Sequence, residues 1–133
     1  MIRLNPEQLV FVTERHLATL TTLRPDGTPH VVPVAFTWDA ETGVARITAN
    51  RTSYKARNLS AQADGEAPRA ALCQLAGPRW ITLEGTIELS DDRAEITDAE
   101  TRYARRYRQQ EPNPDRIVLR VTVDKVMAST YMA

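Results

Sequence analysis

The sequence predicts a mainly β protein, a small antiparallel barrel of six strands with three helices, in one domain spanning residues 1–133. Apolar residues alternate with threonine and glutamate over residues 81–89, which is the period of a strand with one buried face. Other short β-branched and apolar runs recur along the chain with turn residues between them. Six strands joined by short connections favour a closed or nearly closed barrel.

The N-terminal half contains one expected helix and three expected strands. Asn5 followed by Pro6 is a good N-cap and first helical residue, and the apolar pattern continues to about Arg15. Strands are expected at residues 16–24 and 30–38, because the segment between them, 25–28, has the turn chemistry of a hairpin. A second turn at 39–43 leads into a strand at 44–49. We therefore expect a three-stranded meander.

The strand expected at 30–38 is apolar on both of its faces. One alternating set is Val32, Val34, Phe36 and Trp38, and the other is Val31, Pro33 and Ala35. A small barrel buries only its interior face, so the second set needs another cover. Because the N-terminal helix is short, a second subunit is the simpler cover, and we expect a homodimer.

After the strand at 44–49, a helix carries Ala56, Leu59 and Ala63 at helical spacing, and residues 64–66 end it. Strands are expected at 70–75, 80–89 and 117–123. Between the last two, a long helix is expected from about 91 to 109, acidic at its start and basic at its end, as the helix dipole favours. Its late arginines, including Arg102 and Arg106, are interpreted as surface residues, although they could also contact an anionic cofactor tail.

The junction between the strand at 44–49 and the following helix is the strongest candidate site. A helix N-terminus offers free backbone N–H groups and the positive end of the dipole, which suit a phosphorylated ligand. Hydroxyl and cationic side chains gather there in the sequence: Thr48, Arg51, Ser53, Lys55 and Arg57. The five glycines form no phosphate-binding loop, so side chains must hold such a ligand. Ser53 could equally serve only as a helix cap, and the cations could be solvated surface charges.

Composition argues against several other classes. The 17 basic and 17 acidic residues balance, so the overall charge attracts neither nucleic acid nor an anionic membrane. No apolar run approaches the ~20 residues of a membrane span, and the N-terminus lacks a signal-peptide pattern, so we expect a soluble, cytoplasmic protein. One cysteine and two histidines give no metal-ligand spacing, and we expect no metal. Cys73 is interpreted as an unreactive core residue.

The ordered set of segments resembles a known family. It is similar to the flavin- and deazaflavin-binding split β-barrel family, which includes the pyridoxamine 5'-phosphate oxidases and the F420-dependent reductases. The segments that carry the similarity are residues 16–30, Pro33-Val-Ala-Phe36, residues 53–58 and Trp80-Ile-Thr-Leu-Glu-Gly85. The resemblance covers about residues 5–128 and is strongest to the F420-dependent biliverdin reductase-like branch.

The resemblance implies an FMN-binding split barrel that forms a homodimer, with cofactor sites at the subunit interface. Four side chains would face the cofactor phosphate: Thr48, Ser53, Lys55 and Arg57. Arg51 would lie beside further negative groups of the cofactor. Pro33 and Val34 would lie beside the ring through backbone groups, with His30 nearby. Arg79 and Trp80 would come from the partner subunit or the rim, although Trp80 could equally be packing.

The activity that the resemblance implies is reduction of a conjugated small-molecule acceptor, such as biliverdin or a related tetrapyrrole, by coenzyme F420. The basic side chains favour F420 over FMN, because its oligoglutamate tail carries more negative charge. An FMN-dependent enzyme of the same fold and a non-catalytic flavin, deazaflavin or tetrapyrrole carrier are the alternatives. No catalytic acid or base is evident in the sequence.

Overall fold

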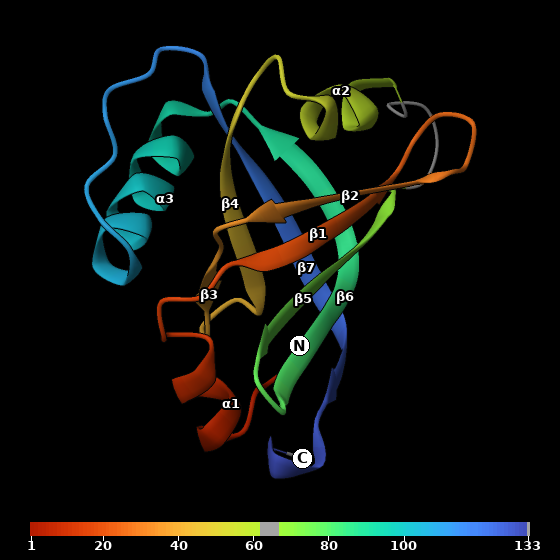
Figure 1. Cartoon of the computed structure of the whole chain (residues 1–133). Helices are drawn as coiled ribbons and strands as arrows, with labels where there is room; N and C mark the ends of the chain where they lie inside the picture. Colours follow the sequence, from red (N-terminus) through yellow and green to blue (C-terminus); the bar gives the residue numbers. More distant parts are fainter. Residues whose placement is uncertain (62–66, 133) are drawn as a thin grey trace.

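The computed structural model describes residues 1–61 and 67–132 and contains one antiparallel sheet with helices around it (Figure 1). In chain order the elements are α1 (Pro6–Phe11), β1 (Ala18–Leu23), β2 (Pro29–Val34), β3 (Thr37–Asp39), β4 (Val44–Asn50), α2 (Tyr54–Ala61), β5 (Arg69–Ala76), β6 (Arg79–Ser90), α3 (Arg93–Arg106), β7 (Arg116–Ala128) and the short 3₁₀ helix η1 (Thr130–Met132). The sheet order is β2-β1-β5-β6-β7-β4-β3. The predicted mainly β class is confirmed.

The predicted strand at 30–38 is wrong as a single element. It is divided into β2 and β3, which lie at opposite ends of the sheet order, so the described chain has seven strands rather than six. β1 and β2 form the predicted hairpin, and β3 and β4 form a second one. The expected meander ends at this break, because β4 pairs with β7 and not with β2. The sheet is therefore split and open rather than closed.

A long β6–β7 ladder forms the centre of the sheet, and its alternation matches the sequence. Ile81, Leu83 and Ile87 are buried, while Thr82, Glu84 and Thr86 on the other face are partly exposed. A bulge between Glu84 and Gly85 bends this pair. Any Cβ at Gly85 would lie 1.9 Å from the carbonyl oxygen of Thr122, so only glycine permits this close approach.

The predicted helices are present, and α1 and α3 are shorter than expected. Asn5 caps α1 in a reciprocal box with Gln8, yet the helix ends at Phe11 rather than near Arg15. The helix expected at 91–109 is α3, which begins after its N-cap Asp92 and ends at Arg106. Residues 63–66, which were expected to finish α2, lie outside the described residues. Cys73 is half-exposed on the sheet rather than in the core.

Helices occupy three places around the sheet (Figure 1). α3 packs along β3, β4 and β7, while α2 lies at one end of the sheet against β1 and β6. α1 lies towards the other end, near the chain termini, where the side-chain amides of Asn5 and Gln8 donate to the carbonyl of Met132. The β4–α2 junction is thus held at one end of the fold.

Candidate functional site

The β4–α2 junction is shaped by Asn50 and Ser53. The Asn50 carbonyl accepts from the Ser53 N–H at 3.0 Å, and its side-chain oxygen accepts from Thr52. The Ser53 hydroxyl accepts from the Ala56 N–H at 3.4 Å, and its carbonyl accepts from the N–H of Arg57. Ser53 therefore begins α2 as a cap, and the first turn of a helix is where backbone N–H groups can bind a ligand.

Lys55 is the most unusual charged residue of the junction. Its side chain is half-buried, and burial lowers the pKa of its ammonium below the ordinary value. No carboxylate of the described residues forms an ion pair with it. A partly desolvated cation without a counter-ion is unfavourable alone and gains from a bound anion. The junction therefore fits a phosphorylated ligand.

Two exposed arginines flank Lys55. The Arg57 guanidinium lies 5.7 Å from the centre of the Tyr54 ring, in cation–π range. The Arg51 guanidinium is 3.9 Å from the carboxylate of Asp91, and both side chains are more than half exposed. Pairing of that kind is weak in water, so Arg51 and Arg57 can both turn towards an added negative group.

His30 lies beside the same helix across a cavity of about 470 Å³, which is lined by Arg24, Pro25, His30, Tyr54 and Asn58. The His30 ring lies 6.3 Å from the Tyr54 ring, and its Nδ1 is buried with no partner among the described residues. An unpartnered buried nitrogen is costly unless something else bonds to it. His30 thus joins the junction residues in space, although 20 positions separate it from Asn50 in the sequence.

Three further predicted residues have different environments. Pro33 is exposed on β2, whereas the Val34 side chain is buried in the core and leaves only its backbone for a ligand. The Thr48 hydroxyl, on β4, accepts a hydrogen bond from the amide of Gln110 at 3.0 Å. Sequence reasoning missed Gln110, because it lies in the irregular segment after α3, where no pattern marks a contact.

Arg79 and Trp80 lie at the β5–β6 turn, at the opposite end of the chain's fold from α2 (Figure 1). Arg79 makes two hydrogen bonds to the carboxylate of Glu14, at 3.0 and 3.1 Å, and these lower the pKa of Glu14 and raise that of Arg79. Trp80 is 37% exposed. One chain alone does not bring these two residues to the β4–α2 junction.

Arg106 corrects the interpretation of the late α3 arginines as surface. It is buried, and it donates to the carbonyls of Glu14 and Phe36 and to the side chain of Gln74. Burial lowers the pKa of its guanidinium. By binding the Phe36 carbonyl, Arg106 fixes the backbone where the predicted strand divides into β2 and β3. Arg102 is also partly buried and pairs with Asp39 and Asp98.

Residues 1–61 and 67–132 lack two features that would point to other functions. No helix there has the length and apolarity of a membrane span. No group of three or more histidine, cysteine, aspartate or glutamate side chains there has the arrangement of a metal site.

Comparison with known proteins gives consistent similarities. The family described as pyridoxamine 5'-phosphate oxidase matches residues 4–129. A Mycobacterium tuberculosis protein named F420H(2)-dependent biliverdin reductase is 46% identical over 127 residues, covering 96% of this chain and 89% of that protein. Among solved structures, a conserved hypothetical protein from Mycobacterium tuberculosis superposes with a TM-score of 0.77 at 19% identity, covering 97% of this chain and 86% of that one. A structure titled F420 reductase superposes with a TM-score of 0.71 at 24% identity, covering 95% and 98%. At these identities the two structures establish the shared fold alone.

Proposed function

This chain belongs to the pyridoxamine 5'-phosphate oxidase family, and we propose that it is a reductase that uses reduced coenzyme F420 to reduce a conjugated acceptor, namely biliverdin or a related tetrapyrrole. The observation that carries the proposal is the high identity, over nearly the whole chain, to a protein named for that activity. The FMN alternative keeps the same fold and the same phosphate site.

The β4–α2 junction fits the phosphate of such a cofactor. The half-buried Lys55 lacks a counter-ion among the described residues, and Ser53 and the first turn of α2 add hydrogen-bond donors. Arg51 and Arg57 are exposed beside it, so they are suited to the carboxylates of an oligoglutamate tail. Arg79 is less suited to this role in its present state, because Glu14 already balances its charge.

When bound, reduced F420 supplies the hydride, and the protein supplies binding and orientation. Lys55 and Ser53 fix the phosphate end, while β2, an edge strand with Pro33 exposed, offers a surface for the ring. His30 lines the cavity beside α2, and its buried Nδ1 has no hydrogen-bond partner among the described residues. Holding both reactants in one geometry is the main rate advantage that these residues offer.

A second copy of the chain is part of the proposal. The pairing register aligns one row of uncharged residues across the outer face of five strands: Pro33, Thr19, Cys73, Thr82 and Met127. Beside this row, Val31 is 56% exposed and Leu75 is 59% exposed. Val31 and Leu75 thus remain exposed in one chain, and a second sheet face would cover them.

Dimerisation also accounts for the separation between Trp80 and α2. Within one chain they lie at opposite ends of the sheet, so Trp80 can contribute to the junction site only from a second chain (Figure 1). We propose that the exposed Trp80 ring of one protomer lies over the cofactor region of its partner. Interfacial tryptophans combine a large apolar surface with one polar group, which suits this position.

The experiment measures binding and turnover separately. Purified protein is titrated with F420 and with FMN, and reduced F420 is then mixed with biliverdin without oxygen while the absorbance of oxidised F420 is followed. We expect tighter F420 binding and biliverdin-dependent oxidation. Tight FMN binding with oxidase activity would replace the proposal with the FMN alternative. F420 binding without turnover on any tetrapyrrole would indicate a carrier.

A further inference from the structure

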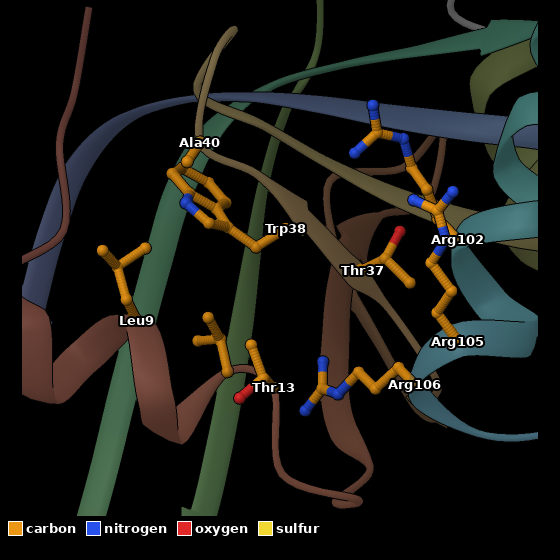
Figure 2. A pocket seen from close by; sticks show the side chains of 9 residues that line it. Leu9, Thr13, Thr37, Trp38, Ala40, Arg102, Arg105 and Arg106 are labelled. Atoms are coloured by element: carbon orange, nitrogen blue, oxygen red, sulfur yellow. The ribbon is translucent and has the colours of Figure 1, made fainter.

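A separate cavity of about 390 Å³ lies between α1, β3 and α3 (Figure 2). Its volume is within the range of ligand pockets, roughly 300–1,000 Å³. Apolar side chains, two threonines and three guanidinium groups line it: Leu9, Val12, Thr13, Thr37, Trp38, Ala40, Arg102, Arg105 and Arg106. No member of this set belongs to the cofactor site proposed above, so the cavity needs an explanation of its own.

The charge along the α3 wall of the cavity is positive and largely uncompensated. Within residues 1–61 and 67–132, the hydrogen-bond partners of Arg106 are all carbonyl or amide oxygens, at Glu14, His16, Phe36 and Gln74. Arg105 is exposed, and no carboxylate of the described chain pairs with it. Of the three lining arginines, only Arg102 forms ion pairs with carboxylates. A cation that is buried without a counter-ion favours an anion nearby.

The opposite wall is apolar and includes one unsatisfied donor. The Trp38 indole lies between Leu9 and the arginines in the view of Figure 2. Its Nε1 is buried, and no acceptor for the N–H lies in the described part of the chain. The indole nitrogen can only donate, and its N–H provides a spectroscopic signal from this wall of the cavity.

We propose that this cavity binds an amphipathic monocarboxylate, with an alkyl or aryl body against Leu9, Val12 and Trp38 and the carboxylate beside Arg105. An inorganic anion would leave the apolar wall unfilled, and an uncharged apolar molecule would leave the Arg105 and Arg106 charges uncompensated. A ligand with both parts fills the apolar wall and places a counter-ion beside the guanidinium groups of α3. The proposal does not depend on F420 or on the reductase activity.

The probe is octanoate, with octanamide as the uncharged ligand of the same length. Calorimetry at low salt measures both affinities, and ¹H–¹⁵N spectra follow the indole N–H of Trp38, which Trp38→Phe assigns. Arg105→Ala removes the free guanidinium. Arg108→Ala is its matched control, because Arg108 is also exposed after α3 but does not line the cavity.

We expect octanoate to bind and to shift the Trp38 indole signal, and octanamide to bind at least about fivefold more weakly. Arg105→Ala should weaken octanoate by about fivefold, the range of a partly exposed ion pair, and Arg108→Ala should leave it unchanged. The proposal is overturned if octanoate does not bind, if both ligands bind equally, or if the two arginine variants behave alike. It is also overturned if the Trp38 signal changes with protein concentration and not with octanoate, because a second chain would then occupy the cavity.

Discussion

Replacing Lys55 by methionine removes the ammonium from the β4–α2 junction and keeps most of the side-chain volume. Because Lys55 is half-buried and has no ion-pair partner among the described residues, its charge contributes nothing to folding that the substitution would remove. The free energy of unfolding should therefore stay the same or rise slightly. The phosphate of the cofactor, in contrast, loses its charged donor.

The size of the loss follows from the environment of Lys55. A hydrogen bond between charged groups contributes about 1.5–3 kcal/mol, and Lys55 is sheltered enough from water for that range to apply. Lys55→Met should then weaken F420 binding roughly 10- to 150-fold. Calorimetric titration measures the affinity, and a thermal melt measures stability. Arg108→Ala, which removes an exposed charge elsewhere, is the control and should change neither.

The same residue predicts a pH dependence. Burial lowers the pKa of the Lys55 ammonium from its ordinary value of 10.5, so the cost of burying the charge is present at low pH. That cost disappears as the pH rises and the amine becomes neutral. A bound phosphate needs the charged form, so cofactor affinity should be highest below the lowered pKa and fall as the pH rises through it. Lys55→Met should lack this alkaline fall.

Two results would refute this reasoning about Lys55. An unchanged dissociation constant would mean that the phosphate lies elsewhere. A large drop in melting temperature would mean that Lys55 has a structural role, and a lowered affinity would then follow from local unfolding.

Three other predictions concern the core, the dimer and the cofactor tail. Arg106→Ala should lower the free energy of unfolding, measured in urea, by about 3–5 kcal/mol, because it leaves several buried oxygens without donors. A decrease of less than about 1 kcal/mol would show that water replaces the guanidinium. In sedimentation, the wild type should have about twice the 14.9 kDa chain mass. Thr82→Asp, on the outer sheet face, should give a folded monomer, whereas the control Thr97→Asp, on α3, should remain a dimer. A monomeric wild type would contradict the proposed dimer. Because Arg51 and Arg57 are exposed beside the junction, F420 should bind more tightly than its tail-less precursor, and the difference in affinity should decrease as salt is added. Equal affinities at low salt would rule out recognition of the tail.

The sequence was sufficient to predict the parts of the fold that depend on interactions between neighbouring residues. The Asn5 cap, the turn at 25–28 and the alternation along β6 each depend on neighbouring residues and were predicted. The β4–α2 junction was also found as a cluster of residues, because Ser53, Lys55 and Arg57 are close in the chain. The common feature of these predictions is that every interaction they need spans only a few residues.

The break between β2 and β3 was missed for a physical reason. Both faces of residues 30–38 are apolar, so no change of period marks the point where the strand leaves one end of the sheet for the other. The position of that break is fixed by Arg106, which binds the Phe36 carbonyl from 70 residues away. An arginine late in a helix satisfies the dipole pattern equally well on the surface or in the core, so the pattern could not distinguish them.

The sequence by itself determined the fold class, the junction and the chemical types of side chain available there. Only the tertiary structure decided which charges are balanced: Arg79 by Glu14, Arg102 by Asp39, and Lys55 by no carboxylate among the described residues. It likewise placed His30 beside α2, and it placed Trp80 at the β5–β6 turn, which lies at the other end of the sheet (Figure 1). The physical reason is that the energy of a charge depends on its burial and on partners that are distant in sequence, and strand pairing and helix packing set both.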